Sequence, residues 1–161
     1  MTRFASPPTD PPHSEINLGV LNDVIGFRLR RIQNDLSRTF VERVGRKELR
    51  PGGFSALALI AANPGLSQTA LSREIGFDKA TVVAIIDSLE QLGWAERRRS
   101  PIDRRRHSLF ISVAGEEALS RLRGLALANE DRIHAALTDA EQQQLFVLLD
   151  KIYSVCFTGE S

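Results

Sequence analysis

Cysteine is almost absent from this sequence, which has only Cys156 among its 161 residues. A single thiol excludes an internal disulfide and a cysteine-rich zinc site, and it is typical of a protein from a reducing cytoplasm. The histidines, His13, His107 and His134, share no spacing that would chelate a metal. We therefore predict no metal site and no cofactor. Cys156 falls beside the apolar stripe of the last expected helix, and we interpret it as a buried, inert thiol.

Long apolar runs are missing as well. No segment approaches the roughly 20 apolar residues that a membrane helix requires, so we expect a soluble protein with no membrane partner. Residues 1–13 are rich in proline and lack an apolar segment, which predicts a disordered N-terminal arm rather than a signal peptide. The sequence also lacks a glycine-rich phosphate loop, a nucleophile motif and paired carboxylates framed by a pocket. These absences argue against an enzyme.

The net charge of +1 hides an uneven distribution of charge. The segment from Arg28 to Arg50 is basic, whereas the segment from Val113 to Ser161 is acidic. The run from Glu96 to Arg106 holds six arginines against two carboxylates, a local charge of +4. Arginine offers a fork of donors that suits phosphates and a narrow minor groove, so this run favours a polyanionic partner such as DNA.

Apolar residues at helical spacing predict one long amphipathic helix from about Ser14 to Val44, with Ser14 as its N-cap. Val20, Val24 and Phe27 lie outside the main stripe. The helix therefore has more apolar surface than one small core needs. This excess indicates a second partner, most simply another copy of the chain.

The middle of the chain predicts three short helices. The first runs from Phe54 to Ala62. The second, from about Gln68 to Ile75, follows the N-cap Ser67, and the third, from Lys79 to Leu92, follows the N-cap Asp78. Two short helices separated by a glycine-containing turn match a helix-turn-helix.

Two strand-like runs follow, Trp94–Arg97 and Leu109–Ser112, and they enclose the arginines as a hairpin encloses its loop. Two amphipathic helices close the chain, about Val113 to Leu137 and Asp139 to Phe157, and a capping box beginning at Thr138 opens the second. The predicted fold class is mainly α with a small β-hairpin wing. It combines a winged helix-turn-helix with a helical dimerisation frame.

The order of these parts and several motifs resemble the MarR family of bacterial winged-helix transcriptional regulators, over the range from about Ser14 to Phe157. Leu49–Leu57 fits the family's Leu-Thr-Pro-x-Gln-aromatic-x-x-Leu motif, and Ser67–Ile75 fits its first helix-turn-helix element. The recognition-helix pattern matches at Thr81, Val82, Asp87, Leu89, Glu90 and Gly93. The wing and the helix start behind it match at Pro101-x-Asp103-Arg104-Arg105 and Ile111-Ser112-x-x-Gly115.

The resemblance implies a homodimer whose interlocked terminal helices place two winged helices on successive major grooves of a pseudo-palindromic operator. It divides the chain into the arm 1–13, a dimerisation region of 14–48 and 113–158, and a DNA-binding domain of 49–112. The implied function is that of a cytoplasmic transcription regulator, most simply a repressor that a small-molecule effector releases from double-stranded DNA. The alternative is a dimeric winged-helix module that binds a protein partner without reading DNA.

The expected DNA contacts lie in the helix-turn-helix and the wing. Val83 and Ala84 stand where the family often has a polar residue and an arginine. An apolar pair contacts a thymine methyl but forms no bidentate hydrogen bonds to guanine, which favours weak base readout and supports the alternative. Asp103 is expected to support the wing by aiming Arg105, the family-matched candidate for minor-groove insertion. The candidate DNA-binding residues are Gln68, Thr69, Lys79, Ala80, Thr81, Val83, Ala84, Arg99, Arg104, Arg105 and Arg106.

The resemblance also suggests an effector site where the first helix meets the Phe54 helix and the winged helix. Phe27, Arg28, Arg31 and Phe54 would supply aromatic walls and a cationic anchor for a small aromatic or anionic molecule. The other interpretation, surface arginines and core phenylalanines, stays open.

Overall fold

The computed structural model describes residues 16–45, 49–99 and 107–157. The chain divides into two compact units, 1–35 and 36–161, and each is described by itself. Within the described residues, no helix combines the length and the apolar character needed to cross a membrane.

The first unit contains a short 3-10 helix, η1 (Gly19–Asp23), and the start of α1 (Ile25–Val44), which continues into the second unit. The side chain of Asn17 accepts a hydrogen bond from the backbone N–H of Gly19, and Val24 has an extended backbone (ψ 103°). The prediction of one continuous helix from Ser14 is therefore wrong over its first part, because Val24 interrupts the helix. Ser14, its expected N-cap, lies outside the described residues.

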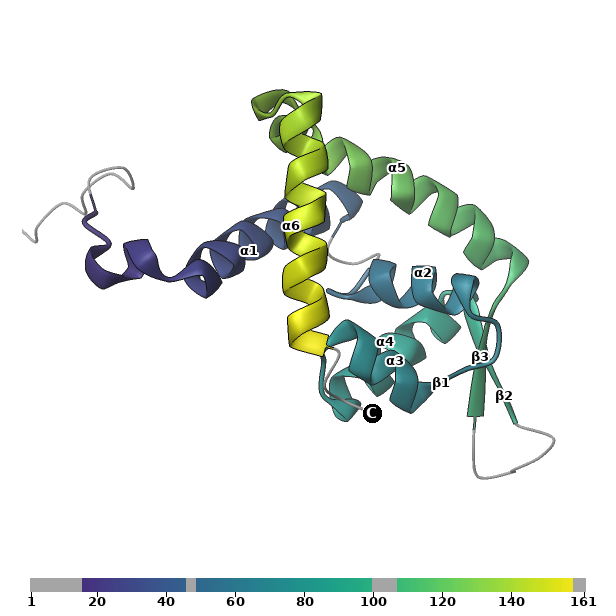
Figure 1. Cartoon of the computed structure of the whole chain (residues 1–161). Helices are drawn as coiled ribbons and strands as arrows, with labels where there is room; N and C mark the ends of the chain where they lie inside the picture. Colours follow the sequence, from purple (N-terminus) through teal and green to yellow (C-terminus); the bar gives the residue numbers. More distant parts are fainter. Residues whose placement is uncertain (1–15, 46–48, 100–106, 158–161) are drawn as a thin grey trace, which may run out of the picture. The chain divides into compact units, whose positions relative to one another are not determined.

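The second unit holds the remaining elements (Figure 1). In chain order they are α2 (Gly53–Ala62), β1 (Leu66–Ser67), α3 (Gln68–Ile75), α4 (Lys79–Gln91), β2 (Ala95–Arg99), β3 (His107–Ile111), α5 (Val113–Ala136) and α6 (Asp139–Phe157). This mainly helical fold with a small sheet confirms the predicted fold class.

Local capping explains where the helices of the second unit begin. The hydroxyl of Ser67 accepts from the N–H of Ala70 at 3.1 Å, and the hydroxyl of Ser112 accepts from the N–H of Gly115 at 3.0 Å. At the start of α6, a Glu141 carboxylate oxygen accepts from the N–H of Thr138 at 2.8 Å, as a capping box requires. Each of these starts agrees with the sequence pattern.

The sheet is antiparallel and has the strand order β1-β3-β2. The predicted hairpin is β2 paired with β3, and Arg97 lies opposite Leu109. Strand β1 was not predicted, because two residues are too few to show a period. It forms where Leu66 pairs with Leu109 from the far side of β3.

The core of the second unit lies between α2, α3, α4, α5 and the sheet. Its fully buried side chains include Leu57, Ile60, Leu71, Ile85, Ile86, Leu89, Leu109 and Leu122. Gly52 has φ of +81°, and a Cβ there would lie 2.4 Å from the Phe77 ring, so the turn before α2 packs closely on the turn between α3 and α4. The buried side chains of α3 and α4, such as Leu71 and Ile86, place the helix-turn-helix on the core.

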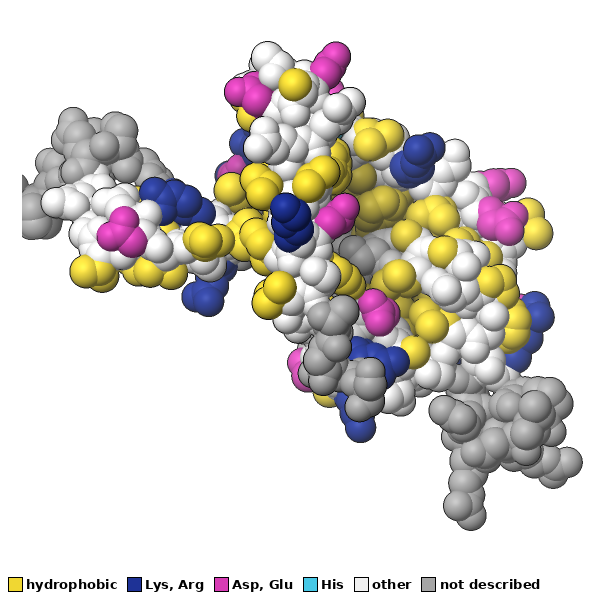
Figure 2. Space-filling model, viewed as in Figure 1, with side chains coloured by type: hydrophobic (Ala, Val, Ile, Leu, Met, Phe, Trp, Pro, Cys, Tyr) yellow, Lys and Arg dark blue, Asp and Glu magenta, His cyan; other side chains and the backbone are white. Residues whose placement is uncertain are grey.

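Helix α6 has no buried residue. Its exposed apolar side chains include Phe146, Val147, Tyr153, Val155 and Phe157, and Figure 2 shows apolar side chains along the face of α6 turned to the viewer. Cys156 is exposed as well. The prediction of a buried thiol is therefore wrong for the single chain, because the helix that carries it is uncovered.

Candidate nucleic-acid interface

The first turns of α3 and α4 carry most of the helix-turn-helix residues that were predicted to contact DNA. Gln68 is half-buried and Thr69 is exposed at the start of α3. Lys79 and Ala80 are exposed at the start of α4, and Thr81 is half-buried. These two helices contact each other, so the two helix starts belong to one packed helix-turn-helix.

Val83 and Ala84 follow within α4. Val83 is 39% exposed, whereas Ala84 is half-buried. An exposed valine on a recognition helix presents methyl groups, which contact a thymine methyl but donate no hydrogen bond to a base edge.

Asp78 caps α4 and also accepts a hydrogen bond from the side chain of Thr81. One carboxylate oxygen of Asp78 accepts from the Thr81 N–H at 3.0 Å, and the other accepts from the Thr81 hydroxyl at 2.6 Å. The Thr81 hydroxyl, followed by its backbone N–H, lowers the pKa of Asp78 below its ordinary value. The carboxylate therefore stays ionised at neutral pH, and the Thr81 hydroxyl proton is already engaged.

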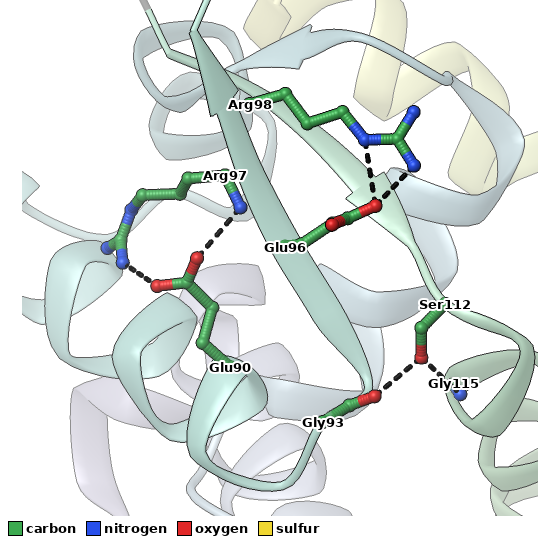
Figure 3. Close-up of polar contacts among 7 residues, drawn as sticks. All are labelled: Glu90, Gly93, Glu96, Arg97, Arg98, Ser112 and Gly115. Carbon is green, nitrogen blue, oxygen red and sulfur yellow. Dashed lines mark hydrogen bonds and ion pairs between the residues drawn. The ribbon is translucent and has the colours of Figure 1, made fainter.

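Arg97 was counted among the arginines available to a polyanion, and the structure corrects that interpretation. Its guanidinium forms an ion pair with Asp87 at 2.7 Å. It also pairs with Glu90, whose carboxylate accepts from the Arg97 backbone N–H at 2.7 Å (Figure 3). The Arg97 side chain is only 18% exposed. Its positive charge is satisfied by the recognition helix itself.

Arg98 is also paired, although it stays on the surface. Its Nε donates to Glu96 of the same strand at 2.7 Å, and its guanidinium carbon lies 4.4 Å from the centroid of the Phe110 ring on β3. The local charge of +4 already includes Glu96, but it leaves out Asp87 and Glu90, which neutralise Arg97 from α4, so it overstates the charge that the hairpin offers to phosphates. Sequence reasoning missed the pairing of Arg97 with Asp87 and Glu90. The signal was the presence of two acidic residues on a helix expected to face DNA, because such residues need a cationic partner within the protein.

The predicted contacts at the hairpin tip, Arg104, Arg105 and Arg106, lie outside the described residues, and so does Asp103. Arg99 ends β2, and the description covers its backbone alone.

A junction of three elements holds the base of the hairpin. The Ser112 hydroxyl donates to the carbonyl of Gly93 at 2.5 Å while it caps α5 (Figure 3). The Ser112 N–H donates to the carbonyl of Trp94 at 3.0 Å. These hydrogen bonds join the end of α4, the start of β2 and the start of α5 at the base of the hairpin.

The predicted effector residues fall in both units. In the first unit, the Arg31 guanidinium lies 5.8 Å from the centroid of the Phe27 ring, and Arg28 donates to the carbonyl of Asn22. In the second unit, Phe54 packs on Phe40 with ring centroids 5.5 Å apart. Among the residues that the structure describes, no three His, Cys, Asp or Glu side chains form a metal-binding group.

Comparisons with known proteins find one family. A family model described as MarR family matches residues 51–106. A putative transcriptional regulatory protein for the hcr operon of Thauera aromatica is 34% identical over 154 residues, which cover 95% of this chain and 93% of that protein. Among solved structures, the transcriptional repressor CouR bound to a 23-mer DNA duplex has a TM-score of 0.76 at 34% identity, and the match covers 86% of this chain and 99% of CouR. CouR bound to p-coumaroyl-CoA has a TM-score of 0.73 at 32% identity, with 86% and 98% covered.

Proposed function

Because this chain belongs to the MarR family of transcriptional regulators, we propose that it binds operator DNA as a homodimer and represses transcription until a small-molecule effector releases it. The observation that carries the proposal is the pair of accessible helix starts in α3 and α4, next to an arginine-bearing hairpin. The DNA-bound state of the similar repressor CouR supports it. Such a protein acts in the cytoplasm and is not an enzyme.

The division of labour follows the sequence. Residues 49–112 are proposed as the DNA-binding domain, and 14–48 together with 113–158 as the dimerisation region. Gln68, Thr69 and Lys79 hold phosphates, while Ala80, Thr81, Val83 and Ala84 face base edges. Arg99, Arg104 and Arg106 bind the backbone of the flanking groove, and Asp103 aims Arg105 into its minor groove.

The experiment selects bound fragments from random DNA and then measures the affinity of the selected operator by fluorescence anisotropy at several salt concentrations. We expect affinity to fall with salt, because lysine and arginine displace counterions from phosphates. Arg105→Ala should bind the operator with a loss of roughly 1–3 kcal/mol, by analogy with a direct base contact. Arg123→Ala on α5 is the charge-matched control, because Arg123 is exposed outside the proposed DNA-binding domain.

Operator affinity of Arg105→Ala equal to that of the parent would contradict the proposed insertion of Arg105 into the minor groove. Absence of any salt-dependent DNA binding by the parent would favour the protein-partner module instead.

The same assay tests the effector. The proposed effector is a small aromatic or anionic molecule, and the CouR complex with p-coumaroyl-CoA supports adding aromatic acyl-CoA thioesters to a panel of aromatic carboxylates. An effector must favour a dimer whose recognition helices are wrongly spaced, because a ligand with equal affinity for both forms shifts nothing. Thermal stabilisation by a ligand that leaves operator affinity unchanged would rule out release by that ligand.

A further inference from the structure

The recognition helix and the hairpin are joined by one guanidinium. The partners of Arg97 on α4 are the Val83 carbonyl at 3.5 Å, the Asp87 carboxylate at 2.7 Å and the Glu90 carboxylate. Val83, Asp87 and Glu90 are spaced by four and three residues, so they lie on one stripe of the helix. The Arg97 side chain therefore lies along α4 while its backbone belongs to β2.

This arrangement is added to the contacts that build the fold. Strand β2 is already paired with β3 throughout its length, and the N–H of Trp94 donates to the carbonyl of Leu89 where the chain leaves α4. Toward the tip from Arg97, the described side chain of Arg98 turns to Glu96 and Phe110 of the hairpin itself. At the level of Arg97, β3 is held by the buried side chain of Leu109 and by its pairing with Leu66 of β1. Without Arg97, β2 would lose its ion pairs with α4, and the part of the hairpin beyond this level could change its angle to α4.

We propose that Arg97 is a positioning residue that fixes the wing at one angle to the recognition helix, so that both reach the operator in register. The inference rests on the proposed DNA-binding function. An ion pair that is partly buried and forked in this way resists rotation, because moving the strand breaks several charge-assisted hydrogen bonds together. Because a pre-set angle spares the complex the cost of ordering the wing, it strengthens binding without any contact to DNA.

Glu90→Gln tests the proposal by the sign of its effect. This substitution removes a negative charge close to a bound polyanion, so electrostatics alone predicts tighter binding. It also replaces the ion pair between Glu90 and Arg97 by a weaker neutral hydrogen bond, so the positioning role predicts weaker operator binding. The new amide oxygen still accepts from the Arg97 N–H, which protects the fold. We expect operator affinity to fall roughly tenfold, the scale of losing one charge-assisted hydrogen bond.

Glu96→Gln is the matched control. It removes the same charge from the same region, but its partner Arg98 stays within the hairpin, on Glu96 of β2 and the Phe110 ring of β3, and its described contacts do not link the hairpin to α4. We expect Glu96→Gln to bind the operator as tightly as the parent or more tightly. Both variants should bind a scrambled duplex of equal length no more weakly than the parent does, so only Glu90→Gln loses its preference for the operator.

Two further variants exclude simpler explanations. If Arg97 contacted phosphate directly, Arg97→Gln would weaken operator and scrambled duplex alike and reduce the salt slope by about one ion, which would overturn the proposal. Asp87→Asn gives a second test of sign, because Asp87 is 50% exposed and its loss disturbs the core little; it should weaken operator binding less than Glu90→Gln. Thermal unfolding of each variant checks that the protein is folded at the temperature of the assay.

Tighter operator binding by both Glu90→Gln and Asp87→Asn would overturn the positioning role. That outcome is distinct from a failure of the proposed function, in which the parent protein itself shows no preference for any duplex.

Discussion

At the scale of single residues, Gly115 is a position where the structure leaves no room for a side chain. A Cβ there would lie 2.0 Å from the Trp94 carbonyl oxygen and 2.8 Å from the side chain of Ile111. A backbone carbonyl cannot move away as a flexible side chain can. We therefore expect Gly115→Ala to lower the free energy of unfolding by about 1–3 kcal/mol, the usual cost of overpacking, as measured by urea denaturation.

Gly124 supplies the control for that prediction, because it lies in the same helix, is exposed, and would place a Cβ within 4 Å of nothing. Gly124→Ala should stabilise the protein by roughly 0.5–1 kcal/mol through helix propensity. Equal effects at both positions would show that propensity, and not the contact with Trp94, decides the role of Gly115.

At the scale of elements, the start of the recognition helix depends on an ionised cap. The hydrogen bonds from Thr81 lower the pKa of Asp78 in the folded state. A carboxylate with a lowered folded pKa contributes stability that is present above its unfolded pKa and lost as the pH falls through the folded pKa. We expect the stability advantage of the parent over Asp78→Asn, a cap that does not titrate, to be largest at neutral pH and to shrink in acid.

Urea denaturation of both proteins across the acidic range measures this difference. Glu141 is a second carboxylate with a lowered pKa, because it accepts from the Thr138 N–H and hydroxyl, so both proteins share its titration. A difference in stability that does not change with pH would contradict the proposed role of the Asp78 charge.

At the scale of the whole molecule, the uncovered apolar surface of α6 predicts self-association. Val155 is 83% exposed, and α6 has no buried residue within the chain. Exposing such a surface to water is unfavourable, and a second copy of the chain offers the same surface in return. Sedimentation should show a dimer at micromolar concentration, and Val155→Asp should shift it toward monomer.

Ser154→Asp is the control, because it adds the same charge to the neighbouring residue of α6, whose hydroxyl donates to the Lys151 carbonyl. If Val155→Asp remains as dimeric as Ser154→Asp, the dimer interface does not include this surface of α6. A well-folded monomer of the parent would contradict the proposed binding to two half-sites.

The sequence by itself determined the helix-turn-helix, the hairpin and the two closing helices, because these depend on interactions within a few residues. Three helices begin at a side chain that accepts from the N–H three residues further on, at Ser67, Asp78 and Ser112. Such N-caps can be recognised in the amino-acid sequence. The family motifs added the expected function. The continuous helix from Ser14 was wrong, since the apolar spacing is the same on both sides of the break at Val24.

Only the tertiary structure decided what the charged and strand residues do. Strand β1 exists because Leu66 meets Leu109, a partner that is distant in the sequence. Cys156 is exposed in the described structure, where α6 has no buried residue. The sequence does not distinguish Arg97 from the neighbouring arginines, but the packing of β2 against α4 brings its guanidinium to Asp87 and Glu90. The sequence does not show which way a charged side chain points. The packing of the elements determines its partner, and that partner determines whether the side chain is available to a ligand or stabilises the fold.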